Sequence, residues 1–189
     1  HQIKNEKIGE FKLFQPKPTY RMDGWQSKTK TEGTNHASGV SVHYYLKGYD
    51  SEKDTISIVL MENDGDTIRS FSTHSKEKKN KLKVEKGGNT FSWNMNYPNA
   101  EKFDGMINWW SSLAGAKAVP GTYKISLSAN GKTQTQTFKI LADPRSEATL
   151  ADMQAQFDFL MELRDKVSET HTAIGNIRKI NKEINRLTK

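Results

Sequence analysis

The hydrophobic period of the chain changes once, at Asp143-Pro144, and this change restricts the fold more than any other feature. Between about residues 35 and 142, short runs rich in β-branched and aromatic residues alternate with polar ones, which is typical of strands. After residue 143, apolar residues recur every three or four positions, which is typical of an amphipathic helix. We therefore expect a mainly β chain with a C-terminal α appendage. The expected elements are an antiparallel β-sandwich in residues 35–142 and a long helical segment in residues 143–189.

Several runs predict individual strands of this sandwich, and two short segments predict turns between them. The stretch VSVHYYL at 40–46 is rich in β-branched and aromatic residues. NDGD at 63–66 predicts a hairpin turn, and Asn130-Gly131 predicts a type I′ turn because both residues tolerate positive φ. The inward-facing residues of four further strands are expected to be Ile56, Ile58 and Leu60; Phe91, Trp93 and Met95; Tyr123, Ile125 and Leu127; and Phe138 and Ile140.

Residues 1–34 are predicted to form an extended N-terminal arm ahead of the sandwich. Pro16 and Pro18 favour extended backbone and exclude a continuous helix. Such an arm is ordered only where its apolar residues dock on the rest of the protein. These residues are Phe11, Leu13, Phe14, Tyr20 and Trp25.

The segment after Pro144 predicts a long amphipathic helix with one apolar stripe. Thr149 and Asp152 resemble a capping box at its start. Gly175 costs about 1 kcal/mol relative to alanine in a helix interior, so a kink or a break of the helix near this residue is one expected outcome. A lone helix cannot bury such a stripe, so we expect a partner helix, in a helical hairpin or a coiled coil. The stripe consists of Leu150, Met153, Phe157, Leu160, Leu163, Val167, Ile174, Ile177, Ile180, Ile184 and Leu187.

The stretch from Asn89 to Leu113 holds three of the four tryptophans of the chain, and it has two interpretations. Tyr97, Phe103, Trp109 and Trp110 could stack on a sugar, as in a carbohydrate-binding module, or they could make packing and interdomain contacts. Adjacent residues of an extended chain point to opposite sides, so Trp109 and Trp110 do not form one flat platform in regular backbone. Packing is therefore the preferred interpretation, with one tryptophan on the core, the arm or the helix and its neighbour partly exposed.

The residue types needed for catalysis are present but not in catalytic patterns. None of the five histidines has helix-type metal spacing, and no HExxH, GxSxG or GxxxxGK[ST] motif occurs. We expect His43 to be a surface cross-strand residue and His171 to lie near the apolar stripe. Glu101 and Asp104 are the best remaining carboxylate pair for a glycosidase, but most acidic residues fall in turns or on the helix exterior. The sequence thus predicts no catalytic residues, no cofactor and no metal site.

The distribution of charged and apolar residues argues against nucleic-acid binding and against a membrane span. The chain has 29 basic and 22 acidic residues, a net charge of +7, and many of the lysines fall in residues 76–88. That segment mixes in glutamates and contains no aromatic residue, whereas single-strand nucleic-acid binders interleave basic and stacking residues. No run approaches the roughly 18 apolar residues of a membrane span. Nucleic acid and a membrane span are therefore not expected.

Several motifs in a fixed order resemble a known family. They are FKLFQPKPTYRM, GVSVHYYLKG, FSWNMNYP, VPGTYKISLSANGKTQTQTFKI, the Asp143-Pro144-Arg145 link and DMQAQFDFLMELRDKVSETHTAIGNIR. Together, from about Phe11 to Arg178, they resemble the C-terminal region of bacterial sortilin-like, BNR-repeat glycosyl hydrolase proteins. The resemblance implies an Ig-like sandwich, similar to FlgD-type and fibronectin-type modules, followed by a helical hairpin. It also implies a periplasmic or extracellular location and a β-propeller elsewhere in the parent protein.

Two departures from the family pattern bear on function. The chain has Asn35-His36-Ala37 where relatives have Asn-Pro-Pro, and WNMNYP at 93–98 where they have Trp-Asp-Leu-Arg-Tyr-Pro. The second departure removes an acid and a base together, and no S-x-D-x-G-x-x-W Asp box occurs.

Because the chain opens on His1, it is expected to be a processed or excised piece of a longer protein. The expected role is a non-catalytic accessory domain that braces the propeller and associates through its helix, as a homo-oligomer or with another partner.

Overall fold

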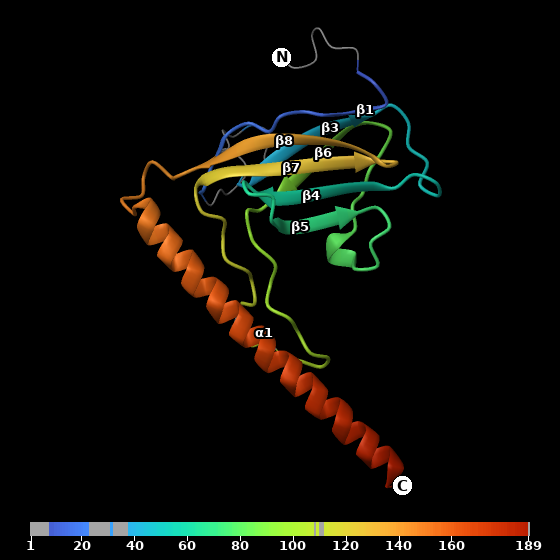
Figure 1. The fold of residues 1–189 in the computed structure, drawn as a ribbon, viewed down its shortest axis with the longest axis vertical. Helices are drawn as coiled ribbons and strands as arrows, with labels where there is room; N and C mark the ends of the chain where they lie inside the picture. Colours follow the sequence, from blue (N-terminus) through green and yellow to red (C-terminus); the bar gives the residue numbers. More distant parts are fainter. Residues whose placement is uncertain (1–7, 23–30, 32–37, 108, 110–111, 189) are drawn as a thin grey trace. The chain divides into compact units, whose positions relative to one another are not determined.

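The computed structural model describes residues 8–22, 31, 38–107, 109 and 112–188. The chain divides into two compact units, each described by itself below. The first unit contains the residues up to Met95 together with Val119–Glu147, and it holds the β-sheets (Figure 1). The second contains Asn96–Ala118 together with the residues from Ala148 onward, and it holds the long helix. Residues 96–118, which the sequence analysis assigned to the sandwich, therefore belong with the helix.

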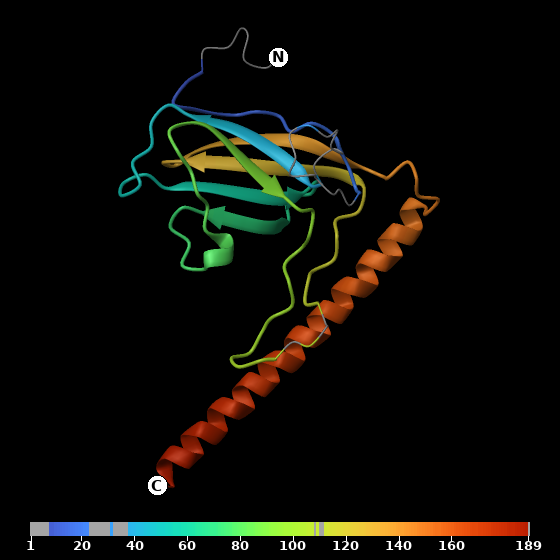
Figure 2. The same ribbon diagram turned by 180° about the vertical axis from the view of Figure 1, so that it is seen from behind.

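The first unit is a β-sandwich of two sheets, as predicted. The strands of the smaller sheet, in the order β1-β3-β6, are Phe11–Leu13, Val40–Leu46 and Gly87–Trp93. Those of the larger, in the order β2-β8-β7-β4-β5, are Thr19–Tyr20, Lys132–Leu141, Gly121–Ala129, Ile56–Glu62 and Thr67–Ser72. All pairs are antiparallel except β2 with β8. This is an Ig-like arrangement, with β3 and β6 as strands B and E facing β4, β7 and β8 as strands C, F and G (Figure 2).

The core lies between the two sheets because alternate residues of each strand point inward. In β3, the buried positions are Val40, Val42, Tyr44 and Leu46, and in β4 they are Ile56, Ile58 and Leu60. An aromatic cluster crosses the core, since Trp93 lies edge-on to Tyr123 and Phe138 at centroid distances of 6.0 and 6.3 Å. The predicted strands and their inward faces are confirmed with two exceptions: Phe91 is only half buried, against Phe71, and Met95 lies beyond the end of its predicted strand.

Both predicted turns are confirmed. Residues 63–66 connect β4 to β5, with Gly65 at a φ of 112° and the Glu62 amide donating to the Asp66 carbonyl at 2.8 Å. Asn130 and Gly131 connect β7 to β8 with φ angles of 49° and 82°, as a type I′ turn requires. The Asn130 side chain also receives a hydrogen bond from the Thr55 amide at 3.1 Å. This second role fixes the turn against the start of β4.

The prediction of an arm over residues 1–34 is wrong for residues 11–20. Phe11–Leu13 and Thr19–Tyr20 pair with β3 and β8, and Phe11, Leu13 and Thr19 are buried. A side chain from far along the sequence completes the pairing. The Leu13 amide donates to Gln134 Oε1 at 2.9 Å, and Gln134 Nε2 donates to the Phe11 carbonyl at 3.0 Å. The prolines mark the crossing from one sheet to the other, and Trp25 lies outside the described residues.

Two features near the sandwich ends were not predicted. The Tyr123 hydroxyl at the start of β7 donates to the Val119 carbonyl at 2.7 Å. This is the tyrosine corner of Ig-like domains, which ties strand F to the connection before it. Met95 was expected to extend the strand of Trp93, but β6 ends at Trp93 and Met95 has a φ of 65°. Met95 is nevertheless fully buried, so its burial was predicted correctly and its backbone was not.

The second unit contains one continuous α-helix, α1, from Leu150 to Leu187. The capping box is confirmed: the Asp152 amide donates to Thr149 Oγ1 at 3.2 Å, and the Thr149 amide donates to Asp152 Oδ2 at 2.9 Å. The helix neither breaks nor ends at Gly175. The described residues from 150 to 187 thus form a single helix rather than a hairpin.

Candidate functional site

The loop of residues 96–118 is held in shape by its own backbone. Asn96 and Lys117 form an antiparallel bridge, and the Tyr97 amide donates to the Ala116 carbonyl at 2.9 Å. The Ala100 amide donates to the Leu113 carbonyl at 2.9 Å, three residues further along in the same register. Gly115 permits this close approach, because a Cβ there would collide with the Tyr97 and Pro98 carbonyl oxygens. The loop is therefore an ordered ribbon at its base.

Aromatic side chains of this loop pack on one face of α1. The ring of Tyr97 meets that of Phe157 edge-on at 4.8 Å, and the ring of Phe103 meets that of His171 at 5.3 Å. The Arg178 guanidinium lies 4.6 Å from the centre of the Phe103 ring, a cation–π contact. Gly175 faces the base of the same side chain, since a Cβ there would lie 3.8 Å from Phe103 Cβ. Phe103 is thus enclosed on two sides by the helix.

Helix side chains also satisfy the loop backbone. His171 Nδ1 donates to the Glu101 carbonyl at 2.6 Å, and the Glu101 amide donates to Ser168 Oγ at 3.1 Å. Arg178 donates to the Asp104 carbonyl at 3.2 Å. Glu101 and Asp104 therefore contact the helix through main-chain atoms, while both residues are exposed. This geometry gives the pair a structural role and places neither carboxylate in a catalytic cleft.

The four aromatic residues predicted as a ligand or interdomain site have different surroundings. Tyr97 is only 6% exposed and Phe103 is half buried, both against α1. Trp109 is 78% exposed, and Ile107, two positions earlier in the sequence, is 80% exposed. Trp110 lies outside the described residues. A flat sugar platform needs several exposed rings, whereas only Trp109 among the three described residues presents one.

The predicted apolar stripe of α1 separates into two sets. Met153 is buried, and Phe157, Val167 and Ile174 are half buried. The remaining members are exposed: Leu150, Leu160, Leu163, Ile177, Ile180, Ile184 and Leu187. Phe159 is also exposed and was missed, because it does not fit the spacing of the single stripe. A shallow hollow of about 230 Å³ lies between the loop strand 112–117 and the helix residues Leu160, Leu163, Arg164 and Val167.

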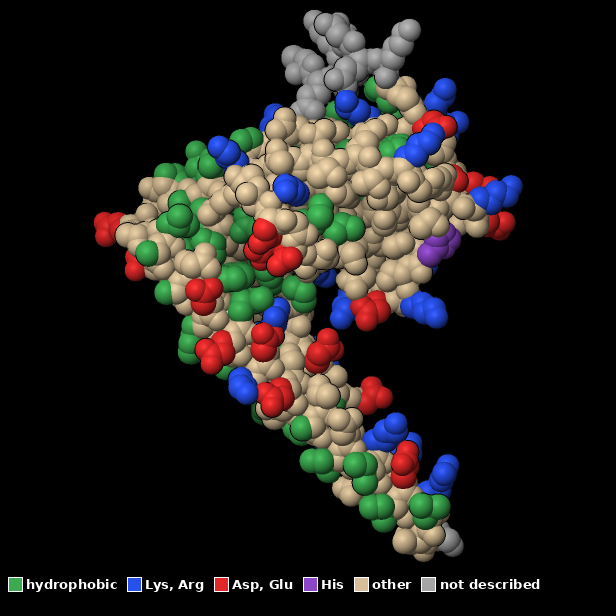
Figure 3. All heavy atoms as spheres, in the orientation of Figure 1, with side chains coloured by type: hydrophobic (Ala, Val, Ile, Leu, Met, Phe, Trp, Pro, Cys, Tyr) green, Lys and Arg blue, Asp and Glu red, His purple; other side chains and the backbone are tan. Residues whose placement is uncertain are grey.

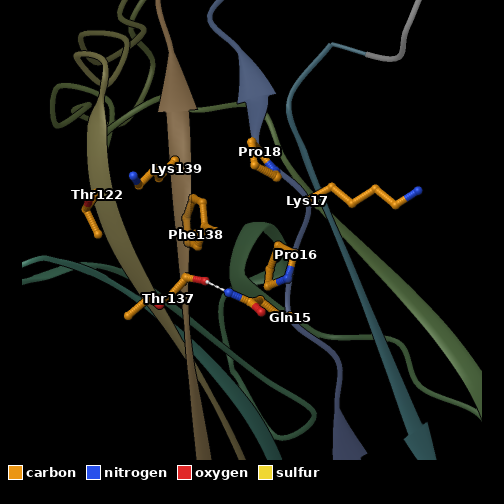
Figure 4. Close-up of a pocket in the computed structure, with 8 residues that line it drawn as sticks. All are labelled: Gln15, Pro16, Lys17, Pro18, Thr122, Thr137, Phe138 and Lys139. Atoms are coloured by element: carbon orange, nitrogen blue, oxygen red, sulfur yellow. Dashed lines mark hydrogen bonds between the residues drawn. The ribbon is translucent and has the colours of Figure 1, made fainter. Parts of the chain in front are cut away.

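The sandwich carries a hollow of about 440 Å³ where the chain crosses from β1 to β2 (Figure 4). Gln15, Pro16, Lys17 and Pro18 line one side, and Thr122, Thr137, Phe138 and Lys139 line the other. Gln15 Nε2 donates to the Thr137 carbonyl across it at 3.3 Å, while the Lys17 side chain extends away from β8. The lining holds no carboxylate or histidine, so this hollow lacks the groups for acid–base catalysis.

The titratable groups also point to structural roles. Hydrogen bonds from Arg145 lower the pKa of Asp143 to about 2, so this carboxyl stays ionised and is no general acid. His43 hydrogen-bonds to Thr90 on the paired strand at 3.0 Å, as expected of a cross-strand surface residue. His171 packs on the loop. Within the described part of the chain, no group of three or more His, Cys, Asp or Glu residues is arranged to hold a metal ion.

Comparison with known proteins assigns the chain to no family. No protein-family model matches the chain, and no curated protein matches it either. No helix within the described ranges is both long and apolar enough to span a membrane. The architecture itself defines the class: an Ig-like β-sandwich with a loop-braced C-terminal helix.

Proposed function

We propose that this chain is a non-catalytic accessory module of a larger exported protein, and that it works by bracing and association. In this proposal the parent is a sortilin-like BNR-repeat protein whose β-propeller is a partner of the module. The proposal draws on the ordered motifs described above and on the Ig-like topology that they imply. The location that goes with it is periplasmic or extracellular.

One observation carries the proposal: the aromatic and titratable groups at which the 96–118 loop meets α1 are engaged in holding the loop and the helix together. The ring of Tyr97 contacts Phe157, and that of Phe103 contacts His171 and Arg178. His171 and Arg178 also donate hydrogen bonds to carbonyl groups of the loop. This bracing supports a helix that continues to Leu187 and whose large apolar residues after Ile174 are all exposed. A helix held in this way suits contact with a further protein surface better than it suits chemistry.

The full reading frame that encodes the chain directly tests whether the parent protein contains a β-propeller. The proposal predicts a β-propeller with Asp-box repeats in the same polypeptide. A second test mixes the purified module with that propeller and measures their association by titration calorimetry. A parent without a propeller, or a propeller that does not bind the module, would contradict bracing.

A carbohydrate-binding module is the second candidate, and the exposure of Trp109 is the observation that favours it. Titration with glycans should then detect binding that Trp109→Ala abolishes and that Tyr20→Ala, a change at another exposed ring, leaves intact. The accessory-module proposal predicts no binding and no glycoside turnover by the chain alone. Turnover, or glycan binding that is lost only with Trp109→Ala, would replace it.

A further inference from the structure

An exposed apolar face runs along α1 at alternating spacings of four and three residues. Its nine positions are all exposed, and seven of them are apolar. We call these positions the outer face: Phe159, Leu163, Lys166, Thr170, Ala173, Ile177, Ile180, Ile184 and Leu187. The six large apolar side chains among them are each 49–80% exposed. Alternating spacings of four and three residues define the seam of a coiled coil.

The outer face is distinct from the face that holds the loop. At about 100° per residue, Ile180 lies about half a turn around the helix from His171, which contacts Glu101. Among the described residues, the loop contacts made by Phe157, His171 and Arg178 lie away from the outer face, and Leu163 at its edge borders the hollow beside the loop strand 112–117. Figure 3 shows hydrophobic side chains at the surface along the C-terminal part of the helix.

The charge of the helix changes sign along its length. Residues 150–169 contain five acidic and two basic side chains, whereas residues 170–189 contain one acidic and five basic side chains. The first half carries a net charge of −3 and the second a net charge of +4. Two such helices attract each other when they run in opposite directions and repel each other when they run in the same direction.

We propose that the outer face binds the outer face of a second copy of this chain, with the two helices antiparallel. This inference rests on the proposed function, since it names the partner of the helix. In the antiparallel register, Phe159 meets the second copy's Ile184, and Leu163 meets its Ile180. Lys166 then meets an isoleucine, Ile177, and keeps its ion pair with Glu169 at 2.8 Å. The small residues Thr170 and Ala173 meet beside the two-fold axis.

The parallel alternative is disfavoured by the same residues. In register, it places Lys166 against the Lys166 of the second copy in the interior of the seam, which leaves like charges poorly solvated. It also brings the two acidic halves together and the two basic halves together. The position of Lys166 in the seam and the charges of the two helix halves therefore both favour the antiparallel orientation.

Cysteine cross-linking tests the orientation, because the natural chain contains no cysteine. Leu163→Cys and Ile180→Cys are made separately, mixed under reducing conditions and then oxidised, and the products are separated by intact mass. The antiparallel dimer predicts a disulfide between the two different variants and little cross-linking of either variant alone. Asn185→Cys, an exposed position off the outer face, is the control and is expected to remain uncross-linked.

The outcomes separate this inference from the proposed function. A dimer in which Ile180→Cys links to itself would overturn the antiparallel register and leave association through the helix standing. Light scattering that shows every reduced variant and the natural chain as monomers would overturn self-association and the associative part of the proposed function. Glycoside turnover, measured separately, bears on the proposed function alone.

Discussion

Replacing Tyr123 by phenylalanine isolates one hydrogen bond of the sandwich. Tyr123 is buried, and its hydroxyl donates to the Val119 carbonyl at 2.7 Å. The ring contacts with Trp93 and Phe138, at 6.0 and 5.9 Å, survive in the variant. The change therefore leaves packing intact and removes the donor from a buried carbonyl.

The expected cost is about 1–3 kcal/mol, because a buried acceptor without a partner loses its solvation as well as the hydrogen bond. For a chain of this length, that corresponds to a drop in melting temperature of about 2–4 °C per kcal/mol. Urea unfolding followed by near-ultraviolet circular dichroism, which reports on the buried aromatic cluster, should show a lower midpoint with an unchanged slope.

Tyr20→Phe is the matched control, since Tyr20 is 44% exposed on the short strand β2. Its effect should stay within about 0.5 kcal/mol. If Tyr123→Phe were as mild as Tyr20→Phe, the tyrosine corner would not be a stabilising feature of this sandwich and the reasoning would fail.

Three further changes test other parts of the account. Burial raises the pKa of Tyr44 to about 12 from an ordinary value of 10.0. The contribution of Tyr44 to stability is therefore complete below pH 10 and is lost as the pH rises through 12. The free energy of unfolding should fall by about 1.4 kcal/mol per pH unit in that window, and Tyr44→Phe should lack this fall. Gly115→Ala should cost about 1–3 kcal/mol, because the added methyl group meets the Tyr97 carbonyl. The loop should then be cleaved faster by a protease, and an unchanged rate of cleavage would contradict the close approach. Thr149→Ala should cost about 1 kcal/mol by removing the helix cap, and a thermal melt at 222 nm unchanged from the natural chain would contradict the cap.

The parts of the fold that sequence predicted are those that local chemistry determines. Asn130-Gly131 makes its turn from the backbone preferences of two adjacent residues, and Thr149 with Asp152 caps the helix within four residues. The strands Val40–Leu46 and Ile56–Glu62 are long enough for their period of two to be visible.

The parts that sequence missed depend on distant partners. β1 and β2 contain three and two residues, too few to show a period, and Gln134 fixes β1 from more than 120 positions away. The apolar spacing of α1 was interpreted as one stripe because sequence does not show which residues the 96–118 loop covers. In the structure, Tyr97 and Phe103 cover one face of α1, and the exposed apolar residues of the helix form a separate surface.

The molar mass in solution tests the central claim, that the helix associates through its outer face. Multi-angle light scattering of the natural chain should give twice the 21.5 kDa mass of one chain at concentrations well above the dissociation constant. The double variant Ile180→Glu with Ile184→Glu, which places carboxylates in the seam, should give a monomer, and Asn185→Glu should remain dimeric. A natural chain that stays at 21.5 kDa at every concentration, or a double variant that stays dimeric, would contradict the account.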